Sequence, residues 1–108
     1  MKLKLKVKKL MADAKLPEYA HPGDAACDLF VSEKIIIKPG ERVQVGTGVA
    51  MEIPHGYVGL IWDKSGLSHK SGLKTLGGVI DAGYRGEVKV GMINLSTDEY
   101  VFEKGQAI

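Results

Sequence analysis

The hydrophobic residues of this 108-residue chain follow a two-residue period, and no stretch shows a convincing 3.6-residue period over a dozen residues. Leu3, Leu5 and Val7 alternate with lysines, and apolar residues alternate again across 43–53 until Pro54 ends the run. Successive side chains of a strand point to opposite faces, so this pattern predicts strands with one solvated face. We therefore expect an all-β fold of short strands joined by Gly- and Pro-containing turns, as in a sandwich or barrel.

The same pattern places the individual elements. The Ile35–Ile37 triplet is β-branched and is interpreted as a buried strand. The lysines of the first strand favour an edge strand protected against pairing with other chains, over a stripe that binds phosphate or nucleic acid. Strands are expected at 2–10, 29–31, 35–37, 43–53, 57–62, 79–80, 88–95 and 100–102, with a long connection at 13–28 and a short helix around 68–71.

Length and composition restrict the class of protein. A chain of 108 residues predicts a single domain, 1–108. Hydrophobic residues at 44% and charged residues at 26% are ordinary globular values, and a net charge of +2 indicates no nucleic-acid partner. No apolar run reaches the ~18 residues of a membrane span, and the N-terminus lacks the apolar region of a signal peptide. One cysteine, Cys27, excludes an internal disulfide, so we expect a cytoplasmic protein.

Three segments are unusual for a plain β-sandwich. The first, 22–29, reads PGDAACDL and combines small residues with the carboxylates of Asp24 and Asp28. Small residues let the backbone pass close to a ligand. A simple turn before a strand, with Asp24 capping it locally, explains the residue types better.

The second segment, 63–67, reads DKSGL and follows a predicted strand. The Lys64 ammonium, the Ser65 hydroxyl and backbone N–H groups near Gly66 have the chemistry of a phosphate cradle. The spacing is not that of a P-loop, and a solvated turn fits the residues about equally well.

The third segment, 77–87, reads GGVIDAGYRGE, in which four glycines surround Asp81 and Tyr84. A tight hairpin with exposed backbone N–H and C=O groups could bind the edge of a small planar ligand. Asp81 lies between apolar Ile80 and Ala82, is interpreted as buried, and could act as a base toward a water molecule. A hairpin with glycines at positive φ and Asp81 capping the turn is an equal alternative.

Together these segments resemble motifs 1, 2 and 3 of the trimeric dUTP diphosphatase (dUTPase) family, in the family's order and near its spacing. Asn94 with FEKGQAI resembles the approach to motif 4, so the resemblance covers almost the whole chain. The most specific match is GVIDAGYRGE. The resemblance implies a homotrimer of jelly-roll-like subunits (distorted barrels of the β-clip type) with active sites shared between neighbours. It also implies hydrolysis of dUTP to dUMP and pyrophosphate with Mg²⁺.

The resemblance also implies roles for residues of the third segment. Asp81 would hold the sugar 3′-OH and orient the water that attacks the α-phosphate. Tyr84 would pack under the deoxyribose and leave no room for a 2′-OH. The backbone of the 77–84 hairpin, including Gly78, Val79 and Ile80, would pair with uracil.

For the first two segments the resemblance implies contacts with phosphate and metal. Ser65 and Gly66 match phosphate contacts, and Lys64 stands where the family usually has Arg, which keeps the charge but loses the bidentate fork. Asp28 would reach Mg²⁺ through water, with the metal bridging the three phosphates. Thr75 stands where many bacterial members have Asn near the base.

Two other functions are weighed against this one. A related dCTP deaminase places a catalytic Glu where this chain has Gly91, and Phe where it has Tyr84, so deamination would lack its base. A catalytically impaired, nucleotide- or protein-binding trimer stays open. The family continues beyond the position of Ile108 with a glutamine of motif 4 and a Gly-rich, arginine-bearing arm, and we expect that arm to be missing here.

Overall fold

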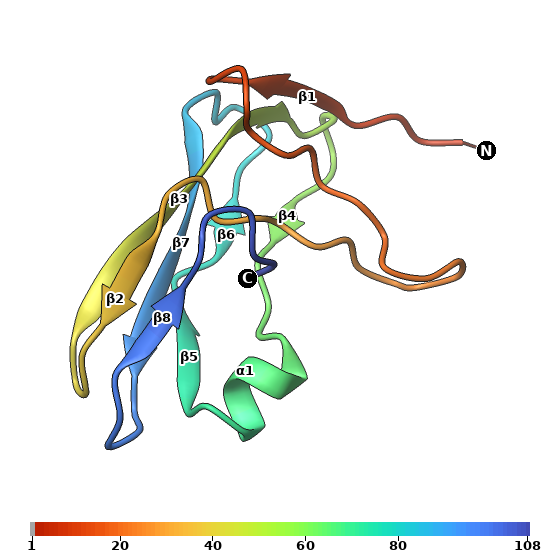
Figure 1. The fold of residues 1–108 in the computed structure, drawn as a ribbon. Coiled ribbons are helices and arrows are strands. Elements are labelled where there is room, and N and C mark those ends of the chain that lie inside the picture. Colours follow the sequence, from red (N-terminus) through yellow and green to blue (C-terminus); the bar gives the residue numbers. More distant parts are fainter. Residues whose placement is uncertain (1) are drawn as a thin grey trace.

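A computed structural model describes residues 2–108 as strands and one short helix (Figure 1). The mostly-β expectation is therefore confirmed, while the barrel and trimer descriptions stay predictions. Within these residues no helix is long and apolar enough to cross a membrane. The elements are β1 (Lys6–Lys9), β2 (Ile35–Ile37), β3 (Arg42–Glu52), β4 (Gly59–Leu60), α1 (Ser65–His69), β5 (Leu73–Leu76), β6 (Val79–Ile80), β7 (Glu87–Asn94) and β8 (Tyr100–Phe102).

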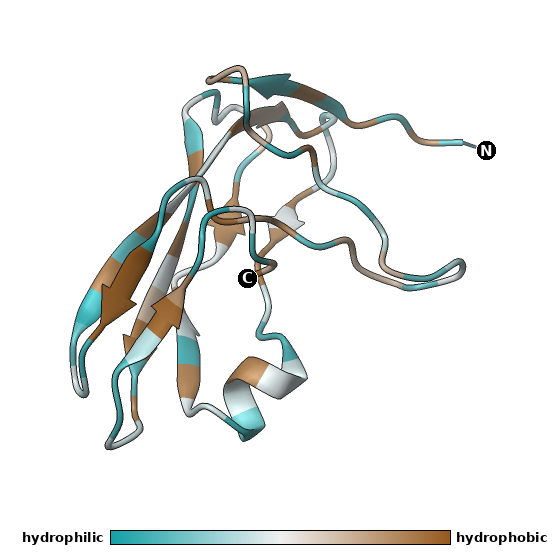
Figure 2. Cartoon of the chain, in the orientation of Figure 1, coloured by the Kyte–Doolittle hydropathy of each residue, from teal (hydrophilic) through white to brown (hydrophobic). Residues whose placement is uncertain are grey.

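The largest sheet is antiparallel and has the strand order β1-β3-β7-β5. β1 lies at its edge, with Lys6 opposite Glu52, and its lysines are exposed around a half-buried Val7. Figure 2 shows this alternation of hydrophilic and hydrophobic residues along β1. The predicted edge position of the first strand is thus confirmed, but the strand covers Lys6–Lys9 and not 2–10, and protection by its lysines stays a prediction.

A bulge in β3 shifts its register against β7 between Gly46 and Ala50. The Thr47 hydroxyl donates to the Val88 carbonyl at 2.6 Å, so this buried polar side chain is satisfied. Gly48 has φ 70° and donates its N–H to Glu87 Oε2 at 3.0 Å. These bonds compensate the backbone groups that the bulge removes from the ladder.

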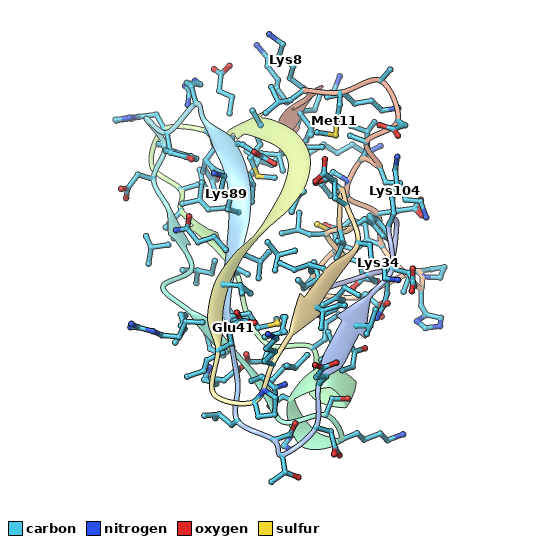
Figure 3. All side chains as sticks on the ribbon, turned by 60° about the vertical axis from the view of Figure 1, so that its left-hand side comes forward. Lys8, Met11, Lys34, Glu41, Lys89 and Lys104 are labelled. Carbon is cyan, nitrogen blue, oxygen red and sulfur yellow. The ribbon has the colours of Figure 1, made fainter. Side chains whose placement is uncertain are left out.

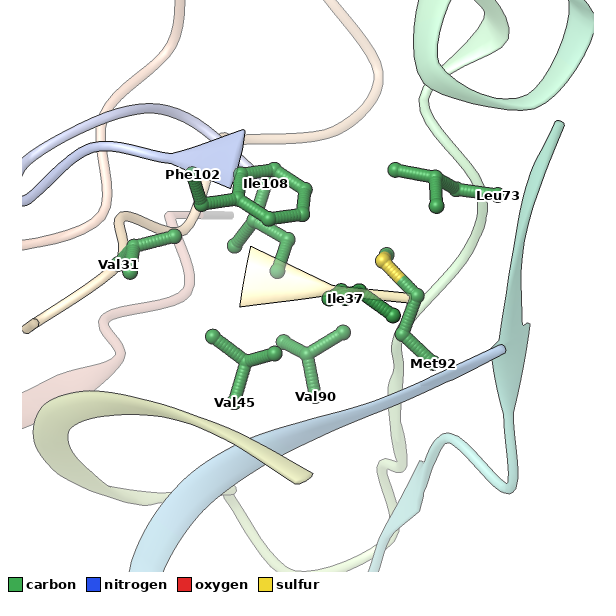
Figure 4. Packing of buried hydrophobic residues seen from close by; sticks show 8 residues of the cluster. All are labelled: Val31, Ile37, Val45, Leu73, Val90, Met92, Phe102 and Ile108. Atoms are coloured by element: carbon green, nitrogen blue, oxygen red, sulfur yellow. The ribbon is translucent and has the colours of Figure 1, made fainter. Parts of the chain in front are cut away.

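Two short ribbons, β2–β8 and β4–β6, accompany the large sheet. Figure 3 shows β2 and β8 lying across from β3 and β7, with side chains filling the space between them. Figure 4 shows the core there, in which Phe102 and Ile37 are fully buried. Its members come from every layer: Val31, Ile37, Val45, Leu73, Val90, Met92, Phe102 and Ile108.

A polar side chain, Asn94, is fully buried at the end of β7. Its Nδ2 donates to the Ile37 carbonyl at 2.9 Å and to the Asp98 carbonyl at 2.8 Å. Its Oδ1 accepts from the backbone N–H and the hydroxyl of Ser96, at 2.9 and 2.7 Å. Asn94 therefore has a structural role, joining β2 to the turn that precedes β8.

Several predicted elements are wrong in extent. The predicted strand at 29–31 is absent, since Phe30 forms only an isolated bridge with Ala107. The strand expected at 57–62 is reduced to β4, and the helix occupies Ser65–His69 instead of 68–71.

Two further corrections concern the strands of the core. β5 was not predicted, because its residues follow a Gly- and Ser-rich stretch that indicates turns. Ile36 is 46% exposed although the triplet 35–37 was interpreted as buried, because period 2 directs the middle side chain of a ribbon strand outward.

Candidate functional site

The candidate phosphate residues Lys64–Gly66, called the phosphate segment, form the N-cap and first two residues of α1 after β4. Lys64 is the N-cap residue of this one-turn helix and makes no side-chain capping bond, so the segment's backbone N–H groups are not capped by it. Its ammonium instead donates to Asp28 Oδ1 at 2.8 Å. The structure thus brings the candidate metal residue of the first segment beside the candidate phosphate residue of the second.

Asp28 is held by backbone pairing across the long connection. Its N–H donates to the Glu18 carbonyl at 2.8 Å, and its carbonyl accepts from the Glu18 N–H at 3.3 Å. Earlier in the segment, Asp24 Oδ2 accepts the His21 N–H at 3.0 Å, which confirms the local cap expected for a plain turn. Of the two carboxylates, only Asp28 reaches another candidate site residue.

The donor set around Asp28 suits a metal that binds mainly to substrate and water. Within residues 2–108 no group of three or more His, Cys, Asp or Glu side chains is placed to hold an ion. Mg²⁺ keeps several waters and commonly uses one or two carboxylates plus substrate phosphates. A single partly buried carboxylate beside a cationic phosphate contact fits that pattern.

A hollow of about 320 Å³ lies beside the third segment. Four candidate residues line this hollow: Gly78, Val79, Ile80 and Tyr84. Because the resemblance implies that this segment binds the base, the hollow is called the base pocket. Gln44 of β3 and Lys89 of β7 also line the hollow. These two were not predicted as site residues: the period-2 pattern places them on the polar face, but no sequence feature places that face beside 78–84.

Only glycine fits at the entry of the base pocket. The Ile61 N–H donates to the Gly78 carbonyl at 2.8 Å, extending the pairing of β4 with β6. Gly78 has φ 106°, and a Cβ there would lie 2.8 Å from the Ile61 carbonyl oxygen. Close backbone approach and a positive φ thus both require glycine.

Tyr84 has a fixed ring. Its hydroxyl donates to the Glu87 carbonyl at 2.7 Å, and a Cβ at Gly86 would lie 2.7 Å from that hydroxyl. The ring therefore occupies space that a side chain at 86 would fill, while 46% of Tyr84 stays exposed. This anchors an aromatic wall beside the hollow.

Two expectations for the third segment are wrong. Asp81 is exposed and not buried, because it stands in a turn closed by the Tyr84 N–H donating to its carbonyl at 3.1 Å. The segment 77–84 is also not a hairpin of two strands paired with each other, since β6 pairs with β4 instead. The glycines at positive φ that were expected are Gly77 and Gly78.

Asp81 and the phosphate segment leave the β4–β6 ribbon at opposite ends. Gly59 pairs with Ile80 in antiparallel register, so Asp81 extends beyond the start of β4. The chain leaves the other end of β4 toward Lys64 and α1 (Figure 1). The ribbon itself therefore does not bring Asp81 beside the phosphate segment.

The packing of β7 against β5 explains why position 91 is glycine. A Cβ there would lie 2.8 Å from the Leu76 carbonyl oxygen, across the β5–β7 pairing of Leu76 with Gly91. A longer side chain at this position requires the strands to move apart. The close packing agrees with the absence of the glutamate that deamination needs.

A network next to the phosphate segment was missed by the sequence analysis. Asp63 Oδ1 accepts the N–H and the hydroxyl of Thr75, at 2.8 and 2.9 Å, and Oδ2 accepts from Lys74 Nζ at 2.6 Å. The Lys74 ammonium, followed by the Thr75 N–H, holds the pKa of the Asp63 carboxyl below its ordinary value. Thr75 was noted only for its possible place near the base, and no sequence signal links it to Asp63.

Comparison with known proteins extends over the whole site. The family model described as dUTPase matches residues 12–108. The deoxyuridine 5'-triphosphate nucleotidohydrolase of Hydrogenobaculum sp. (strain Y04AAS1) is 50% identical over 109 residues, covering 98% of this chain and 76% of that protein. The protein of the same name from Clostridium kluyveri is 44% identical, with the same coverage of both chains. This chain spans 52% of the length of a third relative of that name, from Thermobifida fusca.

Solved structures give the same result for the fold. A mutant dUTPase of phage 80alpha has a TM-score of 0.92 and 32% identity, covering all of this chain and 81% of that one. A mutant dUTPase of the S. aureus phage phi11, described with a structural Mg(II) ion, has a TM-score of 0.92 and 30% identity, covering 98% and 86%. The family match, the relatives and the shared fold agree, and the chain belongs to the dUTPase family.

Proposed function

We propose that this chain hydrolyses dUTP to dUMP and pyrophosphate. The observation that supports this most directly is the hollow bordered by Gly78, Val79, Ile80 and Tyr84, the residues expected to bind base and sugar. The relatives from Hydrogenobaculum and Clostridium are named for this activity. Magnesium is the expected metal; the phi11 enzyme is described with a structural Mg(II) ion.

Base selection rests on backbone groups of the pocket. Uracil and cytosine differ on their hydrogen-bonding edge, where a donor of one base stands in place of an acceptor of the other. The wrong base therefore leaves buried polar groups of the pocket without partners. Such a mismatch discriminates by up to about 10⁴–10⁵-fold, far more than a missing methyl group. Gly78 is suited to this role because its backbone is pinned to Ile61 and cannot turn to suit the wrong base.

Sugar selection rests on Tyr84. The hydroxyl end of its ring is held by the bond to the Glu87 carbonyl and by close packing against Gly86. A fixed ring under the deoxyribose excludes a 2′-OH by steric contact. A mobile ring would move aside and admit UTP.

Asp81 orients the attacking water. Its carboxylate can accept a proton from a water molecule and a hydrogen bond from the 3′-OH. Asp81 is exposed in the single subunit, so a second subunit is needed to exclude bulk water around it.

The phosphate segment binds the triphosphate. Lys64 contributes a cation, Ser65 a hydroxyl, and the uncapped start of α1 contributes backbone N–H groups. Mg²⁺, when bound, neutralises phosphate charge, and Asp28 holds one of its waters. The Lys64–Asp28 pair keeps both side chains in place before the nucleotide binds.

We expect a homotrimer with shared sites, and the position of Asp81 and the phosphate segment at opposite ends of the β4–β6 ribbon supports it. In that arrangement Asp81 of one subunit meets the phosphate segment of a neighbour. The ribbon and its flanks also expose large apolar side chains, as surfaces that bind other subunits do. These are Tyr57, Val58, Leu60, Trp62 and Val79.

The test is pyrophosphate release from dUTP with Mg²⁺, using dCTP, dTTP and UTP as controls. Release from dUTP alone establishes the reaction and both selectivities. Ammonia release from dCTP would instead indicate a deaminase. Binding of dUTP without release of pyrophosphate would indicate an impaired, nucleotide-binding trimer.

Two variants assign the roles. Asp81→Asn removes the proton acceptor and keeps the size, so kcat falls by about 10²-fold or more with binding of dUTP retained. Lys64→Ala removes the phosphate contact and raises KM. Unchanged affinity and rate in Lys64→Ala would refute the phosphate role.

A further inference from the structure

Asp63 stands directly before the phosphate segment, and both of its carboxylate oxygens are engaged with β5. Oδ1 accepts two hydrogen bonds from Thr75, at 2.8 Å from the backbone N–H and 2.9 Å from the hydroxyl. Oδ2 accepts from Lys74 Nζ at 2.6 Å. The Asp63 side chain is 26% exposed, so these bonds are partly shielded from water.

The strand that receives Asp63 is firmly placed. Thr75 is registered opposite Met92 of β7, whose side chain is 2% exposed in the core. Two residues earlier on β5, Leu73 is buried in the same core. Asp63 is therefore attached to the central sheet, whereas the phosphate segment that follows it forms the N-cap and first two residues of a one-turn helix.

The same strand leads into the base pocket. β5 ends at Leu76, and Gly77 and Gly78 connect it to β6, which lines the hollow. One carboxylate thus links the residue before the phosphate segment to the strand before the base pocket. A substitution of Asp63 therefore moves the phosphate segment relative to the base pocket without removing a side chain from the segment or the pocket.

The charge of Asp63 requires a counter-ion. An anion next to the phosphate segment would repel a triphosphate, and Lys74 offsets it at 2.6 Å. The Lys74 ammonium and the Thr75 N–H hold the pKa of Asp63 low, so the carboxylate stays ionised and accepts all three bonds at neutral pH.

We propose that Asp63 is a positioning residue, which fixes the phosphate segment to β5 and so sets its distance from the strand that enters the base pocket. This inference rests on the proposed function. Asp63 acts through Lys64–Gly66 and does not contact the nucleotide.

The test compares Asp63→Ala with Asp63→Asn. Misplacement by about 1 Å can cost 10²-fold, so Asp63→Ala is expected to raise KM for dUTP by about tenfold or more. Inhibition by dUMP, which lacks the β- and γ-phosphates, should stay within about twofold by the same argument. Asp63→Asn keeps an acceptor for the Thr75 N–H and should restore most of the affinity for dUTP.

Lys74→Met is the matched control. It removes the counter-ion and leaves both Thr75 bonds to Asp63, so KM for dUTP should rise less than in Asp63→Ala, and the rise should shrink at higher salt, which screens the charge of Asp63. Melting temperature is measured for every variant at one protein concentration.

Two results would overturn the proposal. One is unchanged KM and kcat in Asp63→Ala. The other is an equal loss of dUTP and dUMP binding that follows the fall in melting temperature, which indicates a purely structural residue. Wild-type protein that neither binds nor hydrolyses dUTP removes the proposed function itself. Wild-type protein that binds dUTP without hydrolysing it leaves the Asp63 comparison to be made from dUTP affinity by calorimetry.

Discussion

Asn94 offers the sharpest test of how this small fold is stabilised. Its side chain is fully buried and forms four hydrogen bonds, to Ile37, Ser96 and Asp98. Asn94→Ala removes all four at once. It also leaves the buried Ile37 carbonyl without this donor.

The size of the effect follows from the bonds. A buried polar group left without a partner costs about 1–3 kcal/mol, and each partly buried bond that water can replace costs about 0.5–1 kcal/mol. One bond of the first kind and three of the second give a loss of about 2.5–6 kcal/mol in the free energy of unfolding. A single domain has a total stability of only about 5–15 kcal/mol, so the variant should be near the limit of folding.

The assay is urea unfolding followed by circular dichroism at fixed protein concentration, because Trp62 is 77% exposed and would report the core poorly. Ser96→Ala is the matched control. It removes the hydroxyl bond at Asn94 Oδ1 and two exposed bonds between the Ser96 hydroxyl and Asp98, and it leaves the other three bonds of Asn94, so it should cost about 1–2 kcal/mol. If Asn94→Ala lowers the free energy of unfolding no more than Ser96→Ala does, Asn94 is not the residue that joins β2 to the turn before β8.

Three further outcomes are expected. Gly78→Ala should lower the melting temperature and abolish dUTP binding, because its Cβ would meet the Ile61 carbonyl oxygen at 2.8 Å. Gly83→Ala, with open space around the position, should have neither effect. Equal melting temperatures and equal dUTP binding in the two variants would contradict the argument. Lys64→Arg should lower KM for dUTP several-fold through bidentate phosphate contact, measured by steady-state kinetics; an unchanged KM would show that the fork does not reach phosphate. The depressed pKa of Asp63 gives stability that is present above the ordinary pKa of 3.8 and is lost as pH falls below it; acid unfolding of Asp63→Asn should show a smaller loss there than wild type.

The sequence predicts the long strands well, since their signal is strong and local. The alternation across 43–53 yields β3, and the run from Val88 yields β7, each to within one or two residues. The isolated strand at 29–31 fails for a physical reason: three apolar residues indicate burial, and Val31 is indeed 2% exposed, but burial alone provides no strand partner. The backbone of this segment pairs singly, through Phe30 with Ala107.

The candidate site is predictable by residue type and not by arrangement. Composition near 63–67 indicates phosphate chemistry, and the structure adds that Lys64 is paired with Asp28, 36 positions earlier in the chain. That contact depends on how the long connection at 13–28 folds back over β4, which no local pattern specifies. The exposure of Asp81 is missed for the same reason, because flanking apolar residues indicate burial only when the backbone is a strand and not a turn.

Gly78 connects packing to the proposed recognition. A Cβ there would lie 2.8 Å from the Ile61 carbonyl oxygen, so the backbones next to the β4–β6 pairing are in close contact. This side of the base pocket is therefore main chain, which no rotamer change can move. In the proposed function, fixed N–H and C=O groups of this kind distinguish the donors of a base from its acceptors. We expect a variant that relaxes the packing at Gly78 to loosen the recognition as well.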